Sequence, residues 1–416
     1  MAYLSVLGGK RLNGEVCASG GKNAALPMLA CALLTAEDVV IKGCPNISDV
    51  SDMLMILRTL GAQVKKEGDT VTVCARDIDT TCMPEELSHK IRSSIFLLGS
   101  MLARKKEACF YPPGGCEIGK RPIDQHLYAL SVMGVDSQWD NGKLFCSTAE
   151  LKGGIINLRF PSVGATENAL LAASLSDGVT VINGAAREPE ICCLCNMLRS
   201  MGARLNGEGT GCIVVEGVKK LHGTELVCLP DRIETCTFLT AAAAAGGSVT
   251  VKNTCPAYFP EVIAVLEKAG AKVKIYGSNV KVDMSERANA FDIITAPFPG
   301  FPTDMQAQMC ALACTSKGTS HITETVFENR LKHIYEMQKA GVSIKKEDNS
   351  VFISGTNKLM PSDFYASDLR SGAALVILAL CCQGKSNVYG TEYIDRGYED
   401  IESKLQLLGA DIRRIT

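Results

Sequence analysis

The chain has few aromatic residues, few histidines and almost no net charge, and each shortage excludes a class of function. Aromatic residues make up 6% of the 416 residues, and 43 lysines and arginines nearly balance 45 aspartates and glutamates. A formal net charge of −2 gives no support to nucleic-acid or membrane-surface binding as the main task. The five histidines are scattered without a pair at ligand spacing, so we expect no histidine-based metal site.

The sequence also lacks a long apolar run and a secretory leader. None of its apolar segments approaches the ~18–20 residues that a membrane span needs, and the first ten residues lack a charged region followed by an apolar one. The 19 cysteines lie mostly in apolar segments of the sequence, which favours reduced, buried thiols and a cytoplasmic location. Cys192 and Cys195 form a C-x-x-C, but no second pair stands at zinc spacing, so we expect no metal.

Nucleotide-cofactor fingerprints are missing as well. The segment Ser19-Gly20-Gly21-Lys22-Asn23 is not a Walker loop, because Val16 stands where a glycine is needed and Asn23 where a serine or threonine would follow the lysine. No dinucleotide fingerprint is found, and we expect no cofactor. The segment can still place backbone N–H groups and Lys22 against an anion at a helix start.

A repeat of about seventy residues organises the chain. A three-residue phrase recurs six times, with a small or apolar residue first, a glycine in the middle and Ala or Val last. The middle glycines are Gly61, Gly134, Gly202, Gly270, Gly341 and Gly409, which are 73, 68, 68, 71 and 68 residues apart. Each glycine closes a helical pattern and precedes a short strand, as expected of a left-handed helix cap.

Each repeat contains two helices of different character. The first is apolar or small on nearly every side, as in Ala24–Leu34 and Gly372–Cys382, so it belongs inside a domain. The second is amphipathic, as in Ser48–Arg58, where we expect Ser48 to cap the helix. Every repeat thus reads as strand, buried helix, strand, exposed helix and two short strands (βαβαββ), which inverts the usual α/β barrel. Six repeats split into two domains of three, which we place at residues 22–229 and at residues 1–21 with 230–416.

Charged and polar residues gather where a strand leads into each buried helix. A junction that only connects a strand to a helix would not need these residues. Because the units repeat, the six junctions should lie at the same ends of their domains. A site rich in cations favours a substrate with several negative charges, such as phosphates and a carboxylate. The junctions are Lys22–Asn23, Lys90–Ser94, Pro161–Thr166, Pro230–Arg232, Pro302–Asp304 and Ser367–Arg370.

One cysteine stands apart from the other eighteen. Cys116 lies in Tyr111–Pro122, where prolines and glycines exclude regular helix or strand and indicate an exposed loop. Lys120 and Arg121 follow closely, and neighbouring cations lower a thiol's pKa. A surface turn with an incidental cysteine is the structural alternative.

Together these motifs resemble the UDP-N-acetylglucosamine 1-carboxyvinyltransferases, a family of the enolpyruvyl transferase superfamily, over essentially the whole chain. The motifs that carry the resemblance are Gly-Gly-Lys22-Asn23-Ala-Ala-Leu-Pro, Arg92-Ser93-Ser94, Pro113-Gly-Gly-Cys116-x-Ile-Gly-x-Arg121-Pro-x-Asp124, Ser162-Val-Gly-Ala-Thr166, Ala186-Arg-Glu188-Pro-Glu190, Asp231-Arg232-Ile-Glu234-Thr, Phe301-Pro-Thr-Asp304-Met-Gln-Ala-Gln308, Thr323-Glu-Thr-Val326-Phe-Glu-Asn-Arg330 and Asp395-Arg-Gly-Tyr-Glu399.

The resemblance implies two inside-out α/β barrels and transfer of enolpyruvyl from phosphoenolpyruvate to the 3′-hydroxyl of UDP-N-acetylglucosamine, the first committed step of peptidoglycan synthesis. It implies Cys116 as proton donor and Asp304 as base, with Lys22 and Arg396 also catalytic. The implied phosphoenolpyruvate-binding residues are Lys22, Asn23, Arg92, Arg121, Arg330, Asp368, Arg370 and Arg396. The implied UDP-sugar-binding residues are Asn23, Arg92, Arg121, Pro122, Ile123, Asp124, Gln125, Ser162, Val163, Gly164, Asp304 and Val326. No protein partner is implied.

One position departs from the family, and two other functions stay open. Many relatives have a lysine two residues before the serine of Ser162-Val-Gly-Ala-Thr166, where this chain has Phe160 beside Arg159. Arg159 is the candidate substitute for that lysine, although adjacent strand residues point to opposite faces, which argues against it. The alternatives are the shikimate-pathway enolpyruvyl transferase, against which the Pro-Gly-Gly-Cys116 segment argues, and a non-catalytic repeat scaffold that binds anions.

Overall fold

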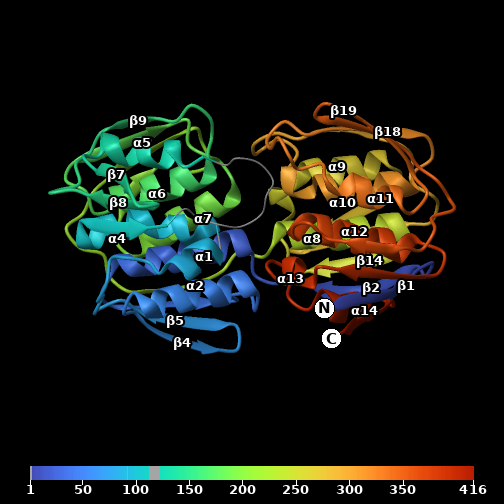
Figure 1. The fold of residues 1–416 in the computed structure, drawn as a ribbon, viewed down its shortest axis with the longest axis horizontal. Helices are drawn as coiled ribbons and strands as arrows, with labels where there is room; N and C mark the ends of the chain where they lie inside the picture. The colour runs from blue at the N-terminus through green and yellow to red at the C-terminus, as the bar shows by residue number, and fades with distance from the viewer. Residues whose placement is uncertain (1, 91, 112–121) are drawn as a thin grey trace. The chain divides into compact units, whose positions relative to one another are not determined.

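The computed structural model describes residues 2–90, 92–111 and 122–416, so Cys116 and Arg121 lie outside the described residues. These residues form two compact units (Figure 1). The N-terminal unit comprises residues 20–111, apart from 91, and 122–229. The C-terminal unit comprises residues 2–19 and 230–416.

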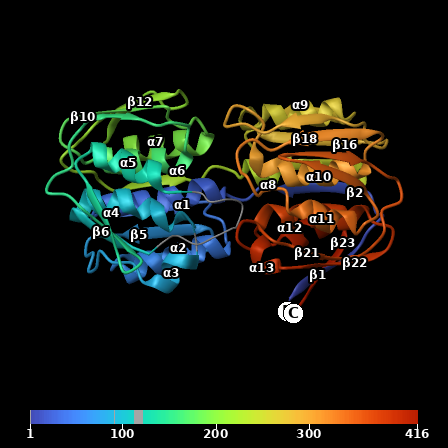
Figure 2. The same cartoon turned by 45° about the horizontal axis from the view of Figure 1, so that its top comes forward.

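The C-terminal unit places three helices inside three sheets. The inner helices are α8 (Arg232–Ala245), α10 (Gln306–Thr315) and α12 (Leu369–Cys381), which contact one another. The outer helices are α9 (Pro260–Lys268), α11 (His333–Gln338), α13 (Thr391–Ile394) and α14 (Ile401–Leu407). Figures 1 and 2 show the inner helices with strands on either side of them.

Each sheet of this unit has four strands, of which one edge strand is parallel to its neighbour. The orders are β15-β16-β14-β2, β17-β18-β20-β19 and β21-β22-β1-β23. The strands are β1 (Tyr3–Leu7), β2 (Leu12–Cys17), β14 (Gly247–Lys252), β15 (Lys272–Tyr276), β16 (Asn279–Met284), β17 (Asp292–Ile294), β18 (Thr319–Thr323), β19 (Ser343–Glu347), β20 (Ser350–Ser354), β21 (Asp363–Tyr365), β22 (Lys385–Tyr389) and β23 (Asp411–Ile415). The N-terminal strands thus complete sheets of the C-terminal half.

The N-terminal unit repeats this plan. Its inner helices are α1 (Lys22–Cys31), α4 (Leu97–Lys105) and α6 (Val163–Ala173), and its other helices are α2 (Ser48–Thr59), α3 (Glu85–Lys90), α5 (Asp124–Val132) and α7 (Pro189–Ser200). The sheet orders are β13-β3-β5-β4, β11-β12-β10-β9 and β6-β8-β7. The strands are β3 (Asp38–Lys42), β4 (Gln63–Glu67), β5 (Thr70–Cys74), β6 (Glu107–Phe110), β7 (Asp136–Asp140), β8 (Lys143–Ser147), β9 (Ile155–Asn157), β10 (Val179–Asn183), β11 (Arg204–Asn206), β12 (Cys212–Glu216) and β13 (Thr224–Val227).

Burial of the inner helices explains their composition. Residues 373–376 of α12 have no exposed surface, so an apolar residue on any side of that helix gains free energy by leaving water. Small residues let the inner helices touch: a Cβ on Gly99 of α4 would lie 2.5 Å from the carbonyl oxygen of Asn168 on α6. The predicted inside-out α/β fold is confirmed.

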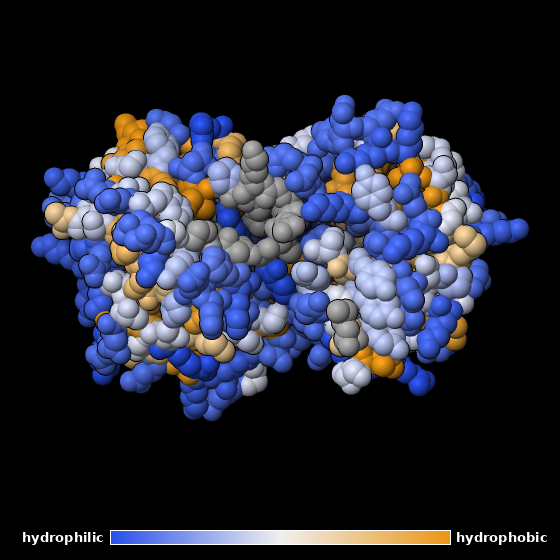
Figure 3. All heavy atoms as spheres, viewed as in Figure 1, coloured by the Kyte–Doolittle hydropathy of each residue, from blue (hydrophilic) through white to orange (hydrophobic). Residues whose placement is uncertain are grey.

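The face of the protein drawn in Figure 3 is largely polar. On the face drawn in Figure 3, hydrophilic side chains predominate and hydrophobic ones are scattered. Among the described helices, none is both long enough and apolar enough to cross a membrane. One local prediction was wrong: α2 begins at Ser48, but its N-cap residue is Ile47 and no side chain caps it.

Candidate active site

The predicted junctions lie at the N-terminal ends of the inner helices. Lys22 is the first residue of α1, and Ser162 is the N-cap of α6. In the C-terminal unit, Asp231 caps α8 and Asp368 caps α12. A helix N-terminus presents unpaired N–H groups and a partial positive charge, so anions are stabilised there. The inner helices therefore collect anion-binding groups at one end.

Asp304 is held between two buried arginines of the C-terminal unit. It lies in the short 3₁₀ helix η4 (Thr303–Met305) that leads into α10. Its Oδ1 accepts a hydrogen bond from Arg330 Nη2 at 2.5 Å, and its Oδ2 accepts one from Arg370 Nη2 at 2.9 Å. The two arginine side chains are 7% and 6% exposed, whereas the Asp304 side chain is 24% exposed. The carboxylate is thus the accessible member of the cluster.

The arginines set the ionisation of this carboxylate. Burial alone would raise the pKa of Asp304, but Arg370 and Arg330 outweigh burial and hold that pKa well below its usual range. Arg232, at the first turn of α8, acts in the same direction. Asp304 is therefore ionised, and it is a weak base while both arginines bind it.

A second carboxylate, Glu324, positions the neighbours of Asp304. Its Oε2 accepts a hydrogen bond from Thr303 Oγ1 at 2.7 Å, and the same Thr303 oxygen accepts one from Arg330 Nη1 at 2.8 Å. Its Oε1 accepts the backbone N–H of Val326 at 2.8 Å. Glu324 thus links η4, Arg330 and the turn that carries Val326.

Arg370 is fixed from its other side by a buried phenol. Its Nη1 lies 3.5 Å from the Tyr398 hydroxyl, which also lies 2.8 Å from Thr237 Oγ1 and accepts a hydrogen bond from Gln308 Nε2 at 3.3 Å. Thr237 belongs to α8 and Gln308 to α10, so this network ties the guanidinium to all three inner helices.

Asp368 and Arg396 lie near the start of α12 and after α13. Asp368 Oδ1 accepts the backbone N–H groups of Arg370 and Ser371, and Ser371 Oγ accepts the N–H of Asp368, which completes a capping box. The carboxylate predicted to bind phosphoenolpyruvate therefore caps a helix in this structure. Arg396 is half-buried in the turn after α13.

In the N-terminal unit, the predicted cations stand at the starts of α1 and of the 3₁₀ helix η2 (Arg92–Phe96). Lys22 Nζ forms an ion pair with Asp49 Oδ2 of α2 at 2.5 Å, and the lysine side chain is 14% exposed. Asn23 is exposed and Arg92 is half-buried at the first position of η2. The lysine is thus held in place by a carboxylate of the adjacent outer helix.

Arg159 contacts the start of α5, where UDP-sugar-binding residues were predicted. Its guanidinium pairs with Asp124, and its backbone N–H donates to Gln125 Oε1 at 2.7 Å. The argument from strand alternation against Arg159 was wrong, because β9 ends at Asn157. Pro122 and Phe160 are exposed, and Ile123 is half-buried as the N-cap of α5.

The starts of α5 and α6 pack together around one glycine. A Cβ on Gly164 would lie 2.8 Å from His126 Cε1 and 3.2 Å from Phe96 Cε1. Ser162 Oγ accepts the N–H of Ala165 at 3.3 Å, and Val163 is half-buried beside it. The predicted residues Ser162–Gly164 and Asp124–Gln125 are therefore brought together.

The profile of the EPSP synthase (3-phosphoshikimate 1-carboxyvinyltransferase) family matches residues 6–405. The chain belongs to this enolpyruvyl transferase family. A relative from Caldanaerobacter subterraneus subsp. tengcongensis named UDP-N-acetylglucosamine 1-carboxyvinyltransferase 2 is 45% identical over 416 residues, which cover 100% of both chains. A UDP-N-acetylglucosamine 1-carboxyvinyltransferase from Prochlorococcus marinus is 43% identical over 99% of this chain and 91% of its own length.

Solved enolpyruvyl transferases share the fold. The enolpyruvyl transferase NikO from Streptomyces tendae superposes with a TM-score of 0.90 at 25% identity, covering 100% of this chain and 99% of its own. EPSP synthase from Acinetobacter baumannii gives a TM-score of 0.78 at 19% identity, covering 100% of both chains. The resemblance found in the sequence motifs is confirmed.

Two predicted residues of this enolpyruvyl transferase, Cys116 and Arg121, lie outside the described residues. Among those described, the structure adds Glu324, Thr303, Tyr398 and Arg232 to the site. Glu324 and Thr303 stand within the motifs ending at Arg330 and at Gln308, and Arg232 ends the predicted junction Pro230–Arg232. The signal of all three was therefore present in the sequence. Tyr398 stands within the motif Asp395-Arg-Gly-Tyr-Glu399, but only folding brings it to Arg370.

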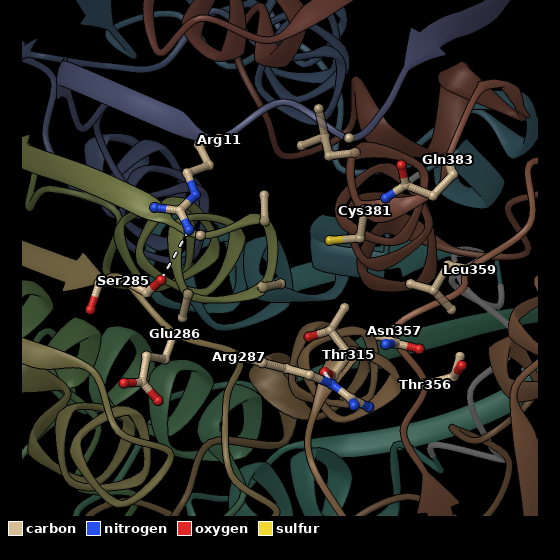
Figure 4. A pocket seen from close by; sticks show the side chains of 16 residues that line it. Arg11, Ser285, Glu286, Arg287, Thr315, Thr356, Asn357, Leu359, Cys381 and Gln383 are labelled. Carbon is tan, nitrogen blue, oxygen red and sulfur yellow. Dashed lines mark hydrogen bonds between the residues drawn. The ribbon is translucent and has the colours of Figure 1, made fainter.

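A pocket of about 260 Å³ lies at the opposite ends of the inner helices of the C-terminal unit. It is lined by the last residues of α8 and α12, by Thr315 of α10, and by Arg11 and Arg287 (Figure 4). Arg287 donates to the carbonyl oxygens of Thr315 and Ser316 at 2.5 Å each, so it caps a helix C-terminus. This pocket is separate from Asp304. Among the described residues, no group of three or more His, Cys, Asp or Glu side chains is placed to hold a metal ion.

Proposed function

We propose that this enolpyruvyl transferase moves the enolpyruvyl group of phosphoenolpyruvate to the 3′-hydroxyl of UDP-N-acetylglucosamine and releases phosphate. The observation that carries the proposal is the Asp304 carboxylate held between Arg330 and Arg370 beside the inner-helix N-termini. It supplies an ionised base next to cations, which is what addition of a hydroxyl to an enol phosphate requires. Relatives named for this reaction at 43% and 45% identity support the choice of acceptor.

Asp304 acts as the base toward the acceptor hydroxyl. As the hydroxyl oxygen bonds to the phosphate-bearing carbon of phosphoenolpyruvate, Asp304 takes the hydroxyl proton and the methylene carbon gains a proton. Elimination then removes a proton from the methyl group so formed and expels phosphate. No electron leaves or enters the substrates, so the reaction needs no redox cofactor.

The substrate itself makes Asp304 a better base. In the free protein, Arg330 and Arg370 hold the pKa of Asp304 well below its usual range. A phosphate or carboxylate of phosphoenolpyruvate competes for the same guanidinium groups, since arginine binds both anions in bidentate fashion. When an arginine turns to the substrate, the pKa of Asp304 rises and proton transfer becomes more favourable.

Cys116 is the acid in this proposal, and the remaining cations hold negative charge. Cys116 donates the proton to the methylene carbon. Lys22, Arg92, Arg121 and Arg396 bind phosphate and carboxylate through the tetrahedral intermediate. Lys22 is suited to this because Asp49 fixes its position while its side chain keeps some exposure.

The UDP-sugar binds residues at the starts of the N-terminal inner helices and at Val326. The proposed set is Asn23, Arg92, Arg121, Pro122, Ile123, Asp124, Gln125, Ser162, Val163, Gly164, Asp304 and Val326. We propose Arg159 as the cation that replaces the family's lysine, because it is exposed and contacts Asp124 and Gln125. We place one domain at residues 22–229 and the other at residues 1–21 with 230–416. Among the described residues, the compact units differ from this division only at Gly20 and Gly21. The described cysteines are free thiols, which supports a cytoplasmic location.

The product identifies the acceptor. The protein is incubated with phosphoenolpyruvate and either UDP-N-acetylglucosamine or shikimate 3-phosphate, and the product is analysed by mass spectrometry and NMR. We expect an enol ether at the 3′-oxygen of UDP-N-acetylglucosamine and none with shikimate 3-phosphate. Turnover of shikimate 3-phosphate alone would assign the chain to the other branch of its family, and turnover of neither would leave an anion-binding scaffold.

A further inference from the structure

Two cysteine thiols meet in the N-terminal unit, whereas Asp304 and its arginines belong to the C-terminal unit. The Sγ atoms of Cys82 and Cys109 lie 2.7 Å apart, within an ångström of the roughly 2.05 Å of a disulfide bond. Cys109 is buried in β6, and Cys82 is half-buried in the segment between β5 and α3.

The backbone holds these thiols side by side. Cys82 and Cys109 form an isolated parallel bridge. The N–H of Cys109 donates to the carbonyl oxygen of Thr81 at 2.8 Å, and the N–H of Met83 donates to the carbonyl oxygen of Cys109 at 2.9 Å. Opposed residues of such a bridge place their side chains on the same face, at the Cα separations that disulfides span.

This bridge stands where the other sheets carry a full strand. Five sheets have a parallel edge strand, namely β2, β9, β13, β17 and β21. In the β6-β8-β7 sheet, no parallel edge strand lies beside β6 among the described residues. The single bridge between Cys82 and Cys109 stands in its place. A covalent bond between them would therefore replace the missing ladder of hydrogen bonds.

The surroundings favour reaction at Cys82. Burial, then the contact with Cys82, raises the pKa of the Cys109 thiol to about 12, while the ammonium of Lys143 acts in the opposite direction. Lys143 Nζ lies 5.0 Å from the ring centre of Tyr111, and both thiols interact electrostatically with it. A partly accessible thiol near a cation is the kind that reacts with disulfides.

We propose that Cys82 and Cys109 form a reversible disulfide, with a small-molecule disulfide as the oxidant. The Cys82 thiolate attacks one sulfur of the oxidant, whose S–S bond breaks and releases one thiol. Cys109 then loses its proton to solvent and attacks Cys82 Sγ, which releases the second thiol. In sum, two protein thiols and one small disulfide become one protein disulfide and two small thiols, and excess small thiol reverses the reaction.

A third cysteine supplies the matched control. Cys146 lies on β8, the strand next to β6, but it is paired with Ala108 and belongs to the apolar core. The Cys146 side chain therefore points to the core face of the sheet. Cys109 is paired with Phe145, which is 43% exposed, so the Cys109 side chain points to the other face. Cys146→Ser should leave the cross-link intact, whereas Cys82→Ser and Cys109→Ser should each abolish it.

The test treats the full chain with glutathione disulfide, blocks remaining thiols by alkylation and maps peptides without reduction. We expect a peptide joining Cys82 to Cys109, its loss after dithiothreitol, and a higher melting temperature of the oxidised parent that Cys82→Ser does not show. Lys143→Gln should form the cross-link more slowly. Exposed Cys17 and Cys212 report that the reagent acted. Glutathione on Cys17 and Cys212 without the Cys82–Cys109 peptide would overturn the proposal. If Cys109→Ser fails to fold, Cys82→Ser provides the loss of the cross-link by itself, because Cys82 is only half-buried.

Discussion

Asp304→Asn separates the charge of the proposed base from its shape. The amide keeps the size of the side chain and one hydrogen-bond acceptor, but it removes the counter-charge of Arg330 and Arg370, whose side chains are 7% and 6% exposed. Loss of a general base lowers turnover by ~10²–10⁴-fold. Breaking a buried ion pair from one side costs ~3–5 kcal/mol. Because Asp304 is 24% exposed, we expect the lower end of that range, about 3 kcal/mol, in the free energy of unfolding.

The assay compares this variant with Asp231→Asn. Asp231 is a junction aspartate of the same unit, and among the described residues its Oδ1 accepts the backbone N–H groups of Ile233 and Glu234 on α8. Asparagine caps a helix as well as aspartate does. Phosphate release should therefore fall sharply in Asp304→Asn and stay within tenfold of the parent in Asp231→Asn. Denaturant unfolding with and without inorganic phosphate adds the stability measurement. Phosphate should restore part of the stability of Asp304→Asn, since an added anion supplies the missing counter-charge.

Two results would refute this reasoning. Near-normal turnover of Asp304→Asn would move the base elsewhere, with Asp231 and Asp368 next to be tested. Unchanged stability of the variant, with no added effect of phosphate, would show that the two arginines do not depend on the Asp304 charge. In that case, competition between substrate and Asp304 for the arginines would also be wrong.

Three further predictions concern other parts of the molecule. Cys116→Asp should retain turnover but resist a small anionic epoxide resembling phosphoenolpyruvate, because a carboxylic acid still donates a proton and is a poor nucleophile; peptide mapping of the parent should find the label on Cys116, and label on another cysteine would contradict this. Burial outweighs Asp368 and lowers the pKa of His333 from 6.5 to about 4. The stability that neutral His333 contributes is therefore complete above pH 6.5 and is lost as the pH falls toward 4. Denaturant unfolding should show that the parent loses roughly 2 kcal/mol of unfolding free energy between pH 7 and pH 5, whereas His333→Phe does not. Gly164→Ala should cost ~1–3 kcal/mol through its contact with His126, whereas Gly211→Ala, which meets no atom within 4 Å, should be neutral in the same measurement.

The repeat made the fold predictable. Six glycines at regular spacing, each after an amphipathic helix, indicated six similar folding elements, and an inner helix apolar on every side had to be buried. The ends of those helices were less well predicted. The apolar segments predicted inner helices at Ala24–Leu34 and Gly372–Cys382, whereas α1 begins at Lys22 and α12 begins at Leu369. Polar residues lie in the first turn of each helix because N–H groups there have no partner within the helix.

The candidate site was predictable in kind but not in its contacts. The junction pattern brought charges to one end of each inner helix, which the structure bears out for Lys22, Asp304 and Arg370. The pairing of Asp304 with Arg330 and Arg370 joins residues 26 and 66 positions apart, so it depends on how η4, α12 and the turn that carries Arg330 pack together. The role of Glu324 needed the folded turn, since its carboxylate bonds both Thr303 and the backbone of Val326.

The central claim is enolpyruvyl transfer to UDP-N-acetylglucosamine, and phosphate release from phosphoenolpyruvate tests it most directly. The measurement is made on the full chain, with and without UDP-N-acetylglucosamine. We predict that phosphate appears only when the acceptor is present, in equal amount to the acceptor consumed. Phosphate release at the same rate without the acceptor, or none with it, would contradict the account.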